Sequence, residues 1–235
     1  MPRILRQILF LVLAVLLLAA AGCEKKAPPP PDLTATKTLA VAGFSNPQHQ
    51  WELLAGCTPS TCTLVKPEVL VKLNQVLADD LTAAGKAFVP RNAVSGCQET
   101  AKLGQYSGSQ QAQALSYWLE VGRCVGTDYL LVPQLMAYRE RVGGEWGVQQ
   151  PASVVMYVYL IDVANGGIAR RFAFDEKQQA LSENLLDLGK FVDRGGKWIT
   201  AEQMADEAIA ESLRSLGLGA PEQTGTAKTG TGQAQ

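Results

Sequence analysis

SVVMYVYLIDV at residues 153–163, ANGG at 164–167 and IARRFAFD at 168–175 together decide the fold of this chain. The first segment is almost entirely apolar and rich in β-branched residues, which is typical of a central strand buried on both faces. The Asn-Gly-Gly sequence predicts a tight hairpin turn. In the returning strand, Phe172 and Phe174 share one face because successive side chains of a strand alternate. The stretch therefore predicts an antiparallel hairpin within a sheet.

Strands and helices alternate upstream of this hairpin. Short apolar segments predict strands at 38–44, 88–90 and 128–138, and segments of helical periodicity predict helices at 67–85, 93–103 and 110–122. Helical crossovers between strands favour parallel pairing. A last helix begins at Thr200, where Gln203 completes a capping-box pattern, and ends at Gly217. The sequence thus predicts an α/β (α+β-like) fold, a mixed sheet of about five strands, three parallel and then an antiparallel hairpin, with helices packed on it.

The first 23 residues, MPRILRQILFLVLAVLLLAAAGC, are similar to a bacterial lipoprotein signal. Arg3 and Arg6 precede an apolar core at 8–18, which is short for a membrane-spanning helix and typical of a cleaved signal. The Gly-Cys junction and the charged residues after it indicate lipidation, with palmitate, at Cys23. A plain signal peptide and an uncleaved anchor are the alternatives. Glu24 stands where enteric inner-membrane lipoproteins carry Asp, so we expect a protein anchored in the cell outer membrane and facing the periplasm.

Composition divides the rest of the chain into three parts. Residues 23–36 hold the lipidated cysteine and four consecutive prolines, which predict an extended tether. Residues 37–218 form the periplasmic domain, and residues 219–235 have the composition of a disordered tail. Without the signal at 1–22, the chain has 21 − 2 = 19 basic and 22 acidic residues. This balance excludes the strongly basic surface of a nucleic-acid binder.

Four cysteines follow the lipidation site, namely Cys57, Cys62, Cys97 and Cys124. An even number in an exported chain predicts two disulfides, with three possible pairings. Proximity in sequence favours Cys57–Cys62 and Cys97–Cys124, and free thiols are the alternative. Zinc needs converging ligands, whereas the chain has a single histidine, His49. We therefore expect no metal and no cofactor.

The sequence contains no recognisable catalytic motif. Phosphate loops, nucleophile elbows and metalloprotease helices are absent from it. His49 lies in a polar loop and is interpreted as exposed. Asp79 and Asp80 point about 100° apart on a helix, so they are interpreted as a solvated face. The prediction is that the chain is not an enzyme; were it one, the carboxylates of Asp175, Glu176 or Glu183 would be the candidates.

Two segments are candidates for contact with a partner. Arg139, Arg141 and Trp146 lie between two predicted strands, where they form either a charged loop or a partner-contact loop. Trp198 lies in the segment 174–200, which either covers the sheet or forms a recognition surface. Exposed aromatic residues often anchor interfaces. These four residues are therefore the predicted partner surface.

Four segments carry a resemblance to a known group of proteins: TLAVAGF at 38–44, VGTDYLLVPQLMAY at 125–138, the hairpin at 154–176 and LSEN at 181–184. They are similar to the periplasmic α/β domain of the TolB amino-terminal domain, the curli secretion-channel lipoprotein and lipoprotein activators of penicillin-binding proteins. The resemblance covers residues 37–217. It implies an α/β fold and binding of envelope proteins, often as oligomers, without enzymatic activity. The loop at 139–152 is too short for a membrane-spanning hairpin, since each crossing takes about 9–11 residues.

These observations predict a lipid-anchored, non-catalytic binding or scaffolding protein of the bacterial cell envelope. Its expected partners are envelope proteins, the membrane through the lipid at Cys23 and, in an oligomer, copies of itself. One alternative is an activator of a peptidoglycan synthase, because a proline-rich tether lets an outer-membrane anchor reach the cell wall. A further alternative is an accessory subunit of an envelope secretion or assembly system.

Overall fold

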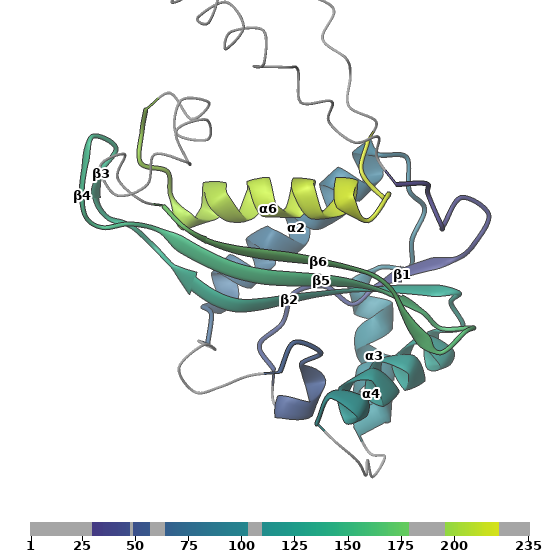
Figure 1. Ribbon diagram of the computed structural model, residues 1–235. Helices are drawn as coiled ribbons and strands as arrows, with labels where there is room; N and C mark the ends of the chain where they lie inside the picture. The colour runs from purple at the N-terminus through teal and green to yellow at the C-terminus, as the bar shows by residue number, and fades with distance from the viewer. Residues whose placement is uncertain (1–29, 48, 57–63, 103–109, 179–195, 221–235) are drawn as a thin grey trace, which may run out of the picture.

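The computed structural model describes residues 30–47, 49–56, 64–102, 110–178 and 196–220. In this part of the chain, helices cover both faces of one sheet (Figure 1). Its strands are β1 (Leu39–Val41), β2 (Tyr129–Arg139), β5 (Ser153–Asp162) and β6 (Gly167–Lys177), and a separate small hairpin consists of β3 (Val142–Gly144) and β4 (Gly147–Gln150). The helices of the described residues are α2 (Pro67–Ala83), α3 (Arg91–Lys102), α4 (Gln110–Val125) and α6 (Ala201–Ser215), with a 3-10 turn at Gln50–Glu52. This arrangement confirms the predicted α/β class.

The strand order in the sheet is β1-β2-β5-β6. β1 pairs with β2 in parallel, and β2 pairs with β5 antiparallel. β5 and β6 pair antiparallel, as the hairpin motif predicts. Of the third parallel strand predicted at 88–90, the structure has one residue, because only Val89 makes a parallel bridge, to Ala40. Pro90 has no N–H to donate and α3 begins at Arg91, so the ladder ends after one residue. The short β3–β4 hairpin, in turn, was not predicted from the sequence.

β5 is the central strand that its apolar sequence predicts. Alternate side chains point to opposite faces, so the strand contributes to two separate cores. One core packs under α2 and α6 and takes Val154, Met156, Val158 and Leu160 from β5. The other packs under α3 and α4 and takes Tyr159 and Ile161. Both faces of this strand are therefore covered along its second half.

The ends of α6 follow from local sequence. Thr200 accepts a hydrogen bond from the Gln203 backbone while the Gln203 side chain accepts one from the Thr200 backbone, which is the predicted capping box. After the helix, Gly217 adopts a φ of 76°, a left-handed conformation that favours glycine. A Cβ there would lie 2.6 Å from the Arg170 guanidinium and 2.8 Å from the Pro31 carbonyl oxygen. Gly217 thus both ends α6 and leaves space for the incoming chain.

Residues before β1 pack against the domain. Leu33 contacts the core under α2 and α6, and Thr34 is buried. Asp32 forms an ion pair with Lys86, which follows α2. Burial opposes the charge on Asp32, but hydrogen bonds from Lys86 and Thr34 outweigh it and lower the pKa of this carboxyl. The last residues of the proline-rich segment are therefore attached to the folded body.

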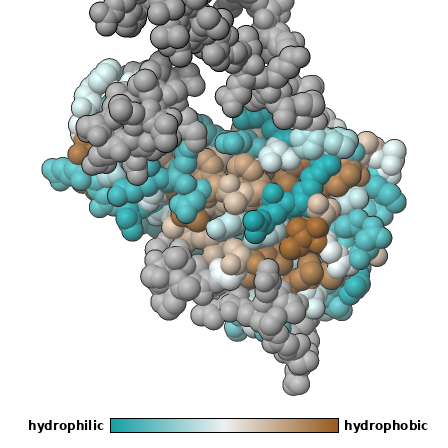
Figure 2. Space-filling model, viewed as in Figure 1, coloured by the Kyte–Doolittle hydropathy of each residue, from teal (hydrophilic) through white to brown (hydrophobic). Residues whose placement is uncertain are grey.

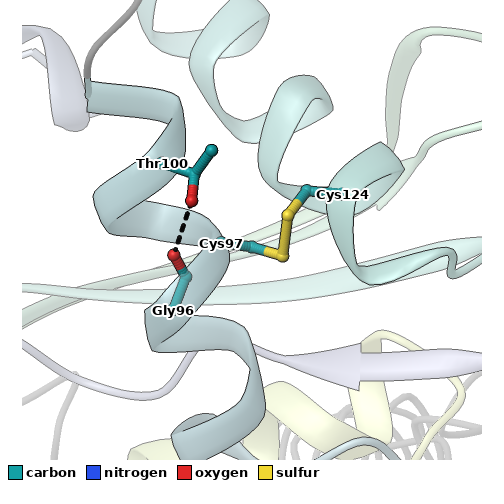
Figure 3. Close-up of a disulfide and its surroundings, with 4 residues drawn as sticks. All are labelled: Gly96, Cys97, Thr100 and Cys124. Carbon is teal, nitrogen blue, oxygen red and sulfur yellow. Dashed lines mark hydrogen bonds between the residues drawn. A yellow bond between two sulfur atoms is a disulfide. The ribbon is translucent and has the colours of Figure 1, made fainter.

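A disulfide joins Cys97 on α3 to Cys124 on α4, with their Cα atoms 5.7 Å apart (Figure 3). It is one of the two predicted pairs. Cys57 and Cys62 lie outside the described residues, as does the lipidation site Cys23. Among the described residues, no helix is both long and apolar enough to cross a membrane.

Candidate partner-binding surface

The β3–β4 hairpin projects from the end of the sheet at which β2 ends and β5 begins (Figure 1). Trp146 lies in its turn with 77% of its surface exposed. Figure 2, in the same view, shows hydrophilic residues gathered over this end of the molecule. We define the arm as this hairpin, residues 142–150, with the segment 197–199 that pairs with it. A large aromatic side chain is thus presented to solvent, on a hairpin whose Val142 is also 48% exposed.

Four contacts fasten the segment before α6 to the hairpin. The Trp198 backbone N–H donates to the Glu145 carbonyl at 2.9 Å, and the Arg141 guanidinium donates to the Trp198 carbonyl. The Lys197 ammonium lies 3.0 Å from a Glu145 carboxylate oxygen and 5.3 Å from the centre of the Trp146 ring. The hydrogen bond and charge of Lys197 lower the pKa of Glu145, so the carboxylate stays ionised at neutral pH. These contacts hold the segment 197–199 beside the hairpin and place the Lys197 ammonium over the Trp146 ring.

Gln178 holds the base of the arm. Its side chain is buried, and both ends of the amide are used: Nε2 donates to the Lys197 carbonyl at 2.9 Å, and Oε1 accepts from the Ile199 N–H at 2.8 Å. Its own N–H donates to the carbonyl of Ala152 at 3.1 Å. Because a buried amide without partners is costly, this residue keeps the segment 197–199 against the end of β5.

A groove of about 390 Å³ lies beside the arm, between the first turns of α2 and α6 and the end of β2. Its apolar lining comprises Leu64, Val65, Val69, Leu73 and Tyr138, and its charged lining comprises Lys66, Glu68, Lys72, Glu140 and Glu202. Leu64 is 81% exposed at its rim. Lys72 and Glu202 form an ion pair of 3.0 Å across α2 and α6. An apolar floor with charges of both signs around it suits a polypeptide segment more than a small charged metabolite.

Glu140 connects the groove to the arm. One carboxylate oxygen accepts from the Tyr138 hydroxyl at 2.9 Å, and the other accepts from the Ala201 N–H at 3.1 Å, at the start of α6. A carboxylate at a helix N-terminus is stabilised by the free N–H groups there. Burial, with the Glu140 carboxylate, raises the pKa of Tyr138 well above its ordinary value, so the phenol remains a donor. Because Glu140 and Ala201 adjoin the two parts of the arm in sequence, the groove and the arm are neighbouring surfaces.

The structure brings three of the four predicted partner-surface residues together. Arg141, Trp146 and Trp198 all belong to the arm contacts described above. Arg139 is exposed at the last position of β2, where its backbone pairs with Ser153. Gln178, Glu140 and Lys197 lie within the two candidate segments, but the sequence does not single them out. No local pattern distinguishes them, since their contacts are made with residues distant in sequence.

The described residues that were considered for catalysis or metal binding are spread over separate elements. His49 is exposed, as expected, and stacks on Trp51 with ring centres 4.9 Å apart. Asp79 is exposed, whereas Asp80 is half-buried, and burial and the neighbouring Asp79 raise its pKa. Asp175 is exposed on β6 and Glu183 lies outside the described residues. Within the described part of the chain, no group of three or more His, Cys, Asp or Glu could hold a metal ion.

No protein-family model and no curated protein matches the chain. Several solved structures do. The PelC dodecamer from Paraburkholderia phytofirmans is 17% identical, with a TM-score of 0.41 over 83% of this chain and 94% of that chain. Lipoprotein GNA1162 from Neisseria meningitidis is 15% identical, with a TM-score of 0.36 over 68% and 93%. The LpoB C-terminal domain from Escherichia coli is 18% identical, with a TM-score of 0.35 over 63% and 88%. These likenesses, at 18% identity or less, concern the fold alone.

Proposed function

We propose that this chain is a lipid-anchored protein of the bacterial outer membrane that faces the periplasm, binds other envelope proteins and catalyses no reaction. The anchor is supported by the signal-like segment that ends at Cys23. Its tether ends before Asp32, because residues from Asp32 onward contact the domain. The binding activity is assigned to the arm and the groove beside it.

The exposed Trp146 on a fastened hairpin is the observation that carries this proposal. Leaving a tryptophan in water forgoes the free energy that its burial would release, of the order of 2–3 kcal/mol. The hairpin that carries it is held in place by the Trp198 and Lys197 contacts with Glu145, so little backbone ordering is needed when a partner covers the side chain. Tryptophan is enriched among the residues that dominate binding energy. An exposed tryptophan on a hairpin next to an apolar groove is thus suited to anchor a partner.

The direct test places a photo-crosslinking amino acid at position 146 in cells that produce the full chain. The matched control is the same amino acid at Val71, an apolar residue of α2 that is 69% exposed and does not line the groove. We expect a defined set of envelope proteins to be captured from position 146 and not from position 71. Equal capture from both positions contradicts the assignment.

Purified components provide the second test. For a partner identified by crosslinking, Trp146→Ala weakens binding by at least tenfold, because hot-spot truncation costs about 2 kcal/mol or more. Val71→Ala leaves the affinity unchanged. Turnover of a substrate by the purified chain would contradict the non-catalytic part of the proposal.

The lipid anchor is tested separately. A Cys23→Ala variant is expected to lose palmitate labelling and to leave the membrane fraction, since Cys23 is the proposed acceptor. Palmitate labelling that persists in this variant would show that Cys23 is not the lipidated residue.

A narrower version of the function is activation of a peptidoglycan synthase. The four prolines at 28–31 favour it, because an extended segment of this kind separates the membrane anchor from the folded body by about 3.1 Å per residue. Addition of the purified chain to a glycan-polymerisation assay should raise the synthase rate, and the Trp146→Ala variant should not. An unchanged rate removes this version and leaves the general proposal intact.

A further inference from the structure

The outer edge of β6 is a surface separate from the arm and the groove. β6 is the last strand in the order β1-β2-β5-β6, and in the described part of the chain it pairs only with β5 (Figure 1). It is 11 residues long. An edge strand of this length presents a row of backbone N–H and C=O groups that a further strand can pair with.

The two faces of β6 differ in character. Phe174 is buried in the core under α2 and α6, and Phe172 packs against the same core. Arg171, Ala173 and Asp175 alternate with them on the opposite face, and all three are exposed. A strand added at this edge would therefore continue an aromatic row on one face and a charged row on the other.

We propose that β6 pairs antiparallel with β6 of a second copy of this chain, about a two-fold axis that passes through Ala173. In this register Arg171 lies opposite Asp175 of the second copy, and Phe172 lies opposite Phe174 of the second copy. Symmetry repeats each pair on the other side of the axis. Opposite charges and aromatic pairs directly across a strand pair are both stabilising. The axis is perpendicular to the sheet, so α2 and α6 of both copies lie on the same side of a continuous sheet.

The charges discriminate between registers. An axis through Phe174 would place Arg171 opposite Lys177, and an axis through Arg171 would place that residue opposite itself. An axis through Asp175 likewise opposes two carboxylates. An axis through Phe172 leaves Arg171 and Asp175 opposite alanines, without partners across the strands. Charged residues on an edge strand usually prevent pairing. Here they disfavour these registers and favour the one centred on Ala173.

This inference goes beyond the proposed function, because it concerns a different surface and a defined partner. The arm can bind an envelope protein whether or not β6 pairs. Conversely, variants of β6 leave Trp146 and the groove unchanged. Failure of one proposal is therefore distinguishable from failure of the other.

Charge reversal tests the register. The full mature chain in detergent is compared with Arg171→Asp, Asp175→Arg and the variant that carries both changes, by sedimentation velocity over a range of concentrations. Each single change turns two attractive pairs into two repulsive ones, so we expect the dimer dissociation constant to rise by about tenfold or more. The double variant restores opposite charges and should dimerise like the original chain. Both residues are exposed, and equal thermal unfolding temperatures confirm that the variants are folded.

Disulfide trapping tests the position of the axis. Two Ala173 Cα atoms at the axis would lie about 4.5–5.5 Å apart, within the range of a disulfide. The two copies of Ala169, exposed on the same strand, would lie about 26 Å apart at roughly 3.3 Å per residue. Mild oxidation of membranes should therefore crosslink Ala173→Cys into a dimer and leave Ala169→Cys at the level of the unsubstituted chain.

Several results overturn the proposal. A monomer at all concentrations does so, as does an oligomer that neither single charge reversal weakens. A double variant that stays dissociated refutes the register, and crosslinking that is absent at position 173 or equal at positions 169 and 173 refutes the axis.

Discussion

Removal of the Cys97–Cys124 disulfide should destabilise the protein by about 3.5 kcal/mol. The bridge closes a loop with a sequence separation of 27 residues. For a loop of this length, the loss of chain entropy in the unfolded state is about 12 cal/mol/K, which is about 3.5 kcal/mol at room temperature. This is a large part of the roughly 5–15 kcal/mol by which a domain is usually stable.

The structure indicates why α3 depends on this bridge. Only Val94 and Ala101 of α3 are buried hydrophobic residues, and burying a valine contributes about 1.5 kcal/mol or somewhat more. Apolar anchorage of the helix is therefore of the same order as the contribution of the disulfide. Without the bridge, α3 should also separate from α4 at a lower free energy than the rest of the domain unfolds.

Equilibrium urea unfolding of Cys97→Ala, Cys124→Ala and the double variant measures the effect. Each single change already removes the bridge, so each should cost nearly as much as the double change, and the second substitution should add about 0.5 kcal/mol or less. This non-additivity separates the loss of the bridge from the loss of two side chains. The reasoning would be refuted if the free energy of unfolding of the double variant were within about 0.5 kcal/mol of that of the original chain. It would also be refuted if the losses of the two single variants summed to the loss of the double variant.

Three further predictions concern the other elements. Leu81→Ala on α2, where the side chain is fully buried, should cost about 2–5 kcal/mol in urea unfolding because it leaves a cavity, whereas Val71→Ala on the exposed face should cost less than about 0.5 kcal/mol. Thr200→Ala removes the acceptor of the Gln203 N–H and should cost about 1 kcal/mol in the same assay, and Thr200→Ser should retain most of the stability. Asp206→Asn should stabilise the protein at neutral pH: burial, then the charges of Glu202 and Asp80, raise the pKa of Asp206 above its ordinary 3.8, so stability is lost as the pH rises from 3.8 through the folded-state pKa. The free energies of unfolding of the Asn variant and the original chain should become more alike as the pH is lowered to 3.8. A difference in free energy of unfolding that is constant with pH would contradict this.

Much of the fold could be predicted from sequence because its determinants are local. The apolar run at 153–163 and the Asn-Gly-Gly turn specify a hairpin through the period of side chains along a strand. The capping box at Thr200 and the glycine at 217 are set by contacts within a few residues. The Cys97–Cys124 pair follows from proximity in sequence and from the small number of pairings.

The arm and the groove could be predicted only in part. Arg141, Trp146 and Trp198 can be identified from sequence. They are charged or aromatic residues in polar segments that lack the apolar periodicity of a helix or strand. Gln178 and Glu140 lie in the same candidate segments but are not distinguished there, because a Gln or Glu in a polar stretch is compatible with any exposed loop. Their roles arise from burial and from partners elsewhere in the chain.

The sequence by itself determined the class of the fold, the central strand, the last helix and its ends, because each depends on side-chain periodicity or capping within a few residues. Only the tertiary structure decided that the segment at 88–90 makes a single bridge, that residues 197–199 close on the β3–β4 hairpin, and that β6 is an edge strand. Those outcomes depend on pairing register and on contacts such as Arg141 with Trp198, 57 residues apart. Such contacts form when whole elements pack, and the free energy of that packing is not encoded in any one segment.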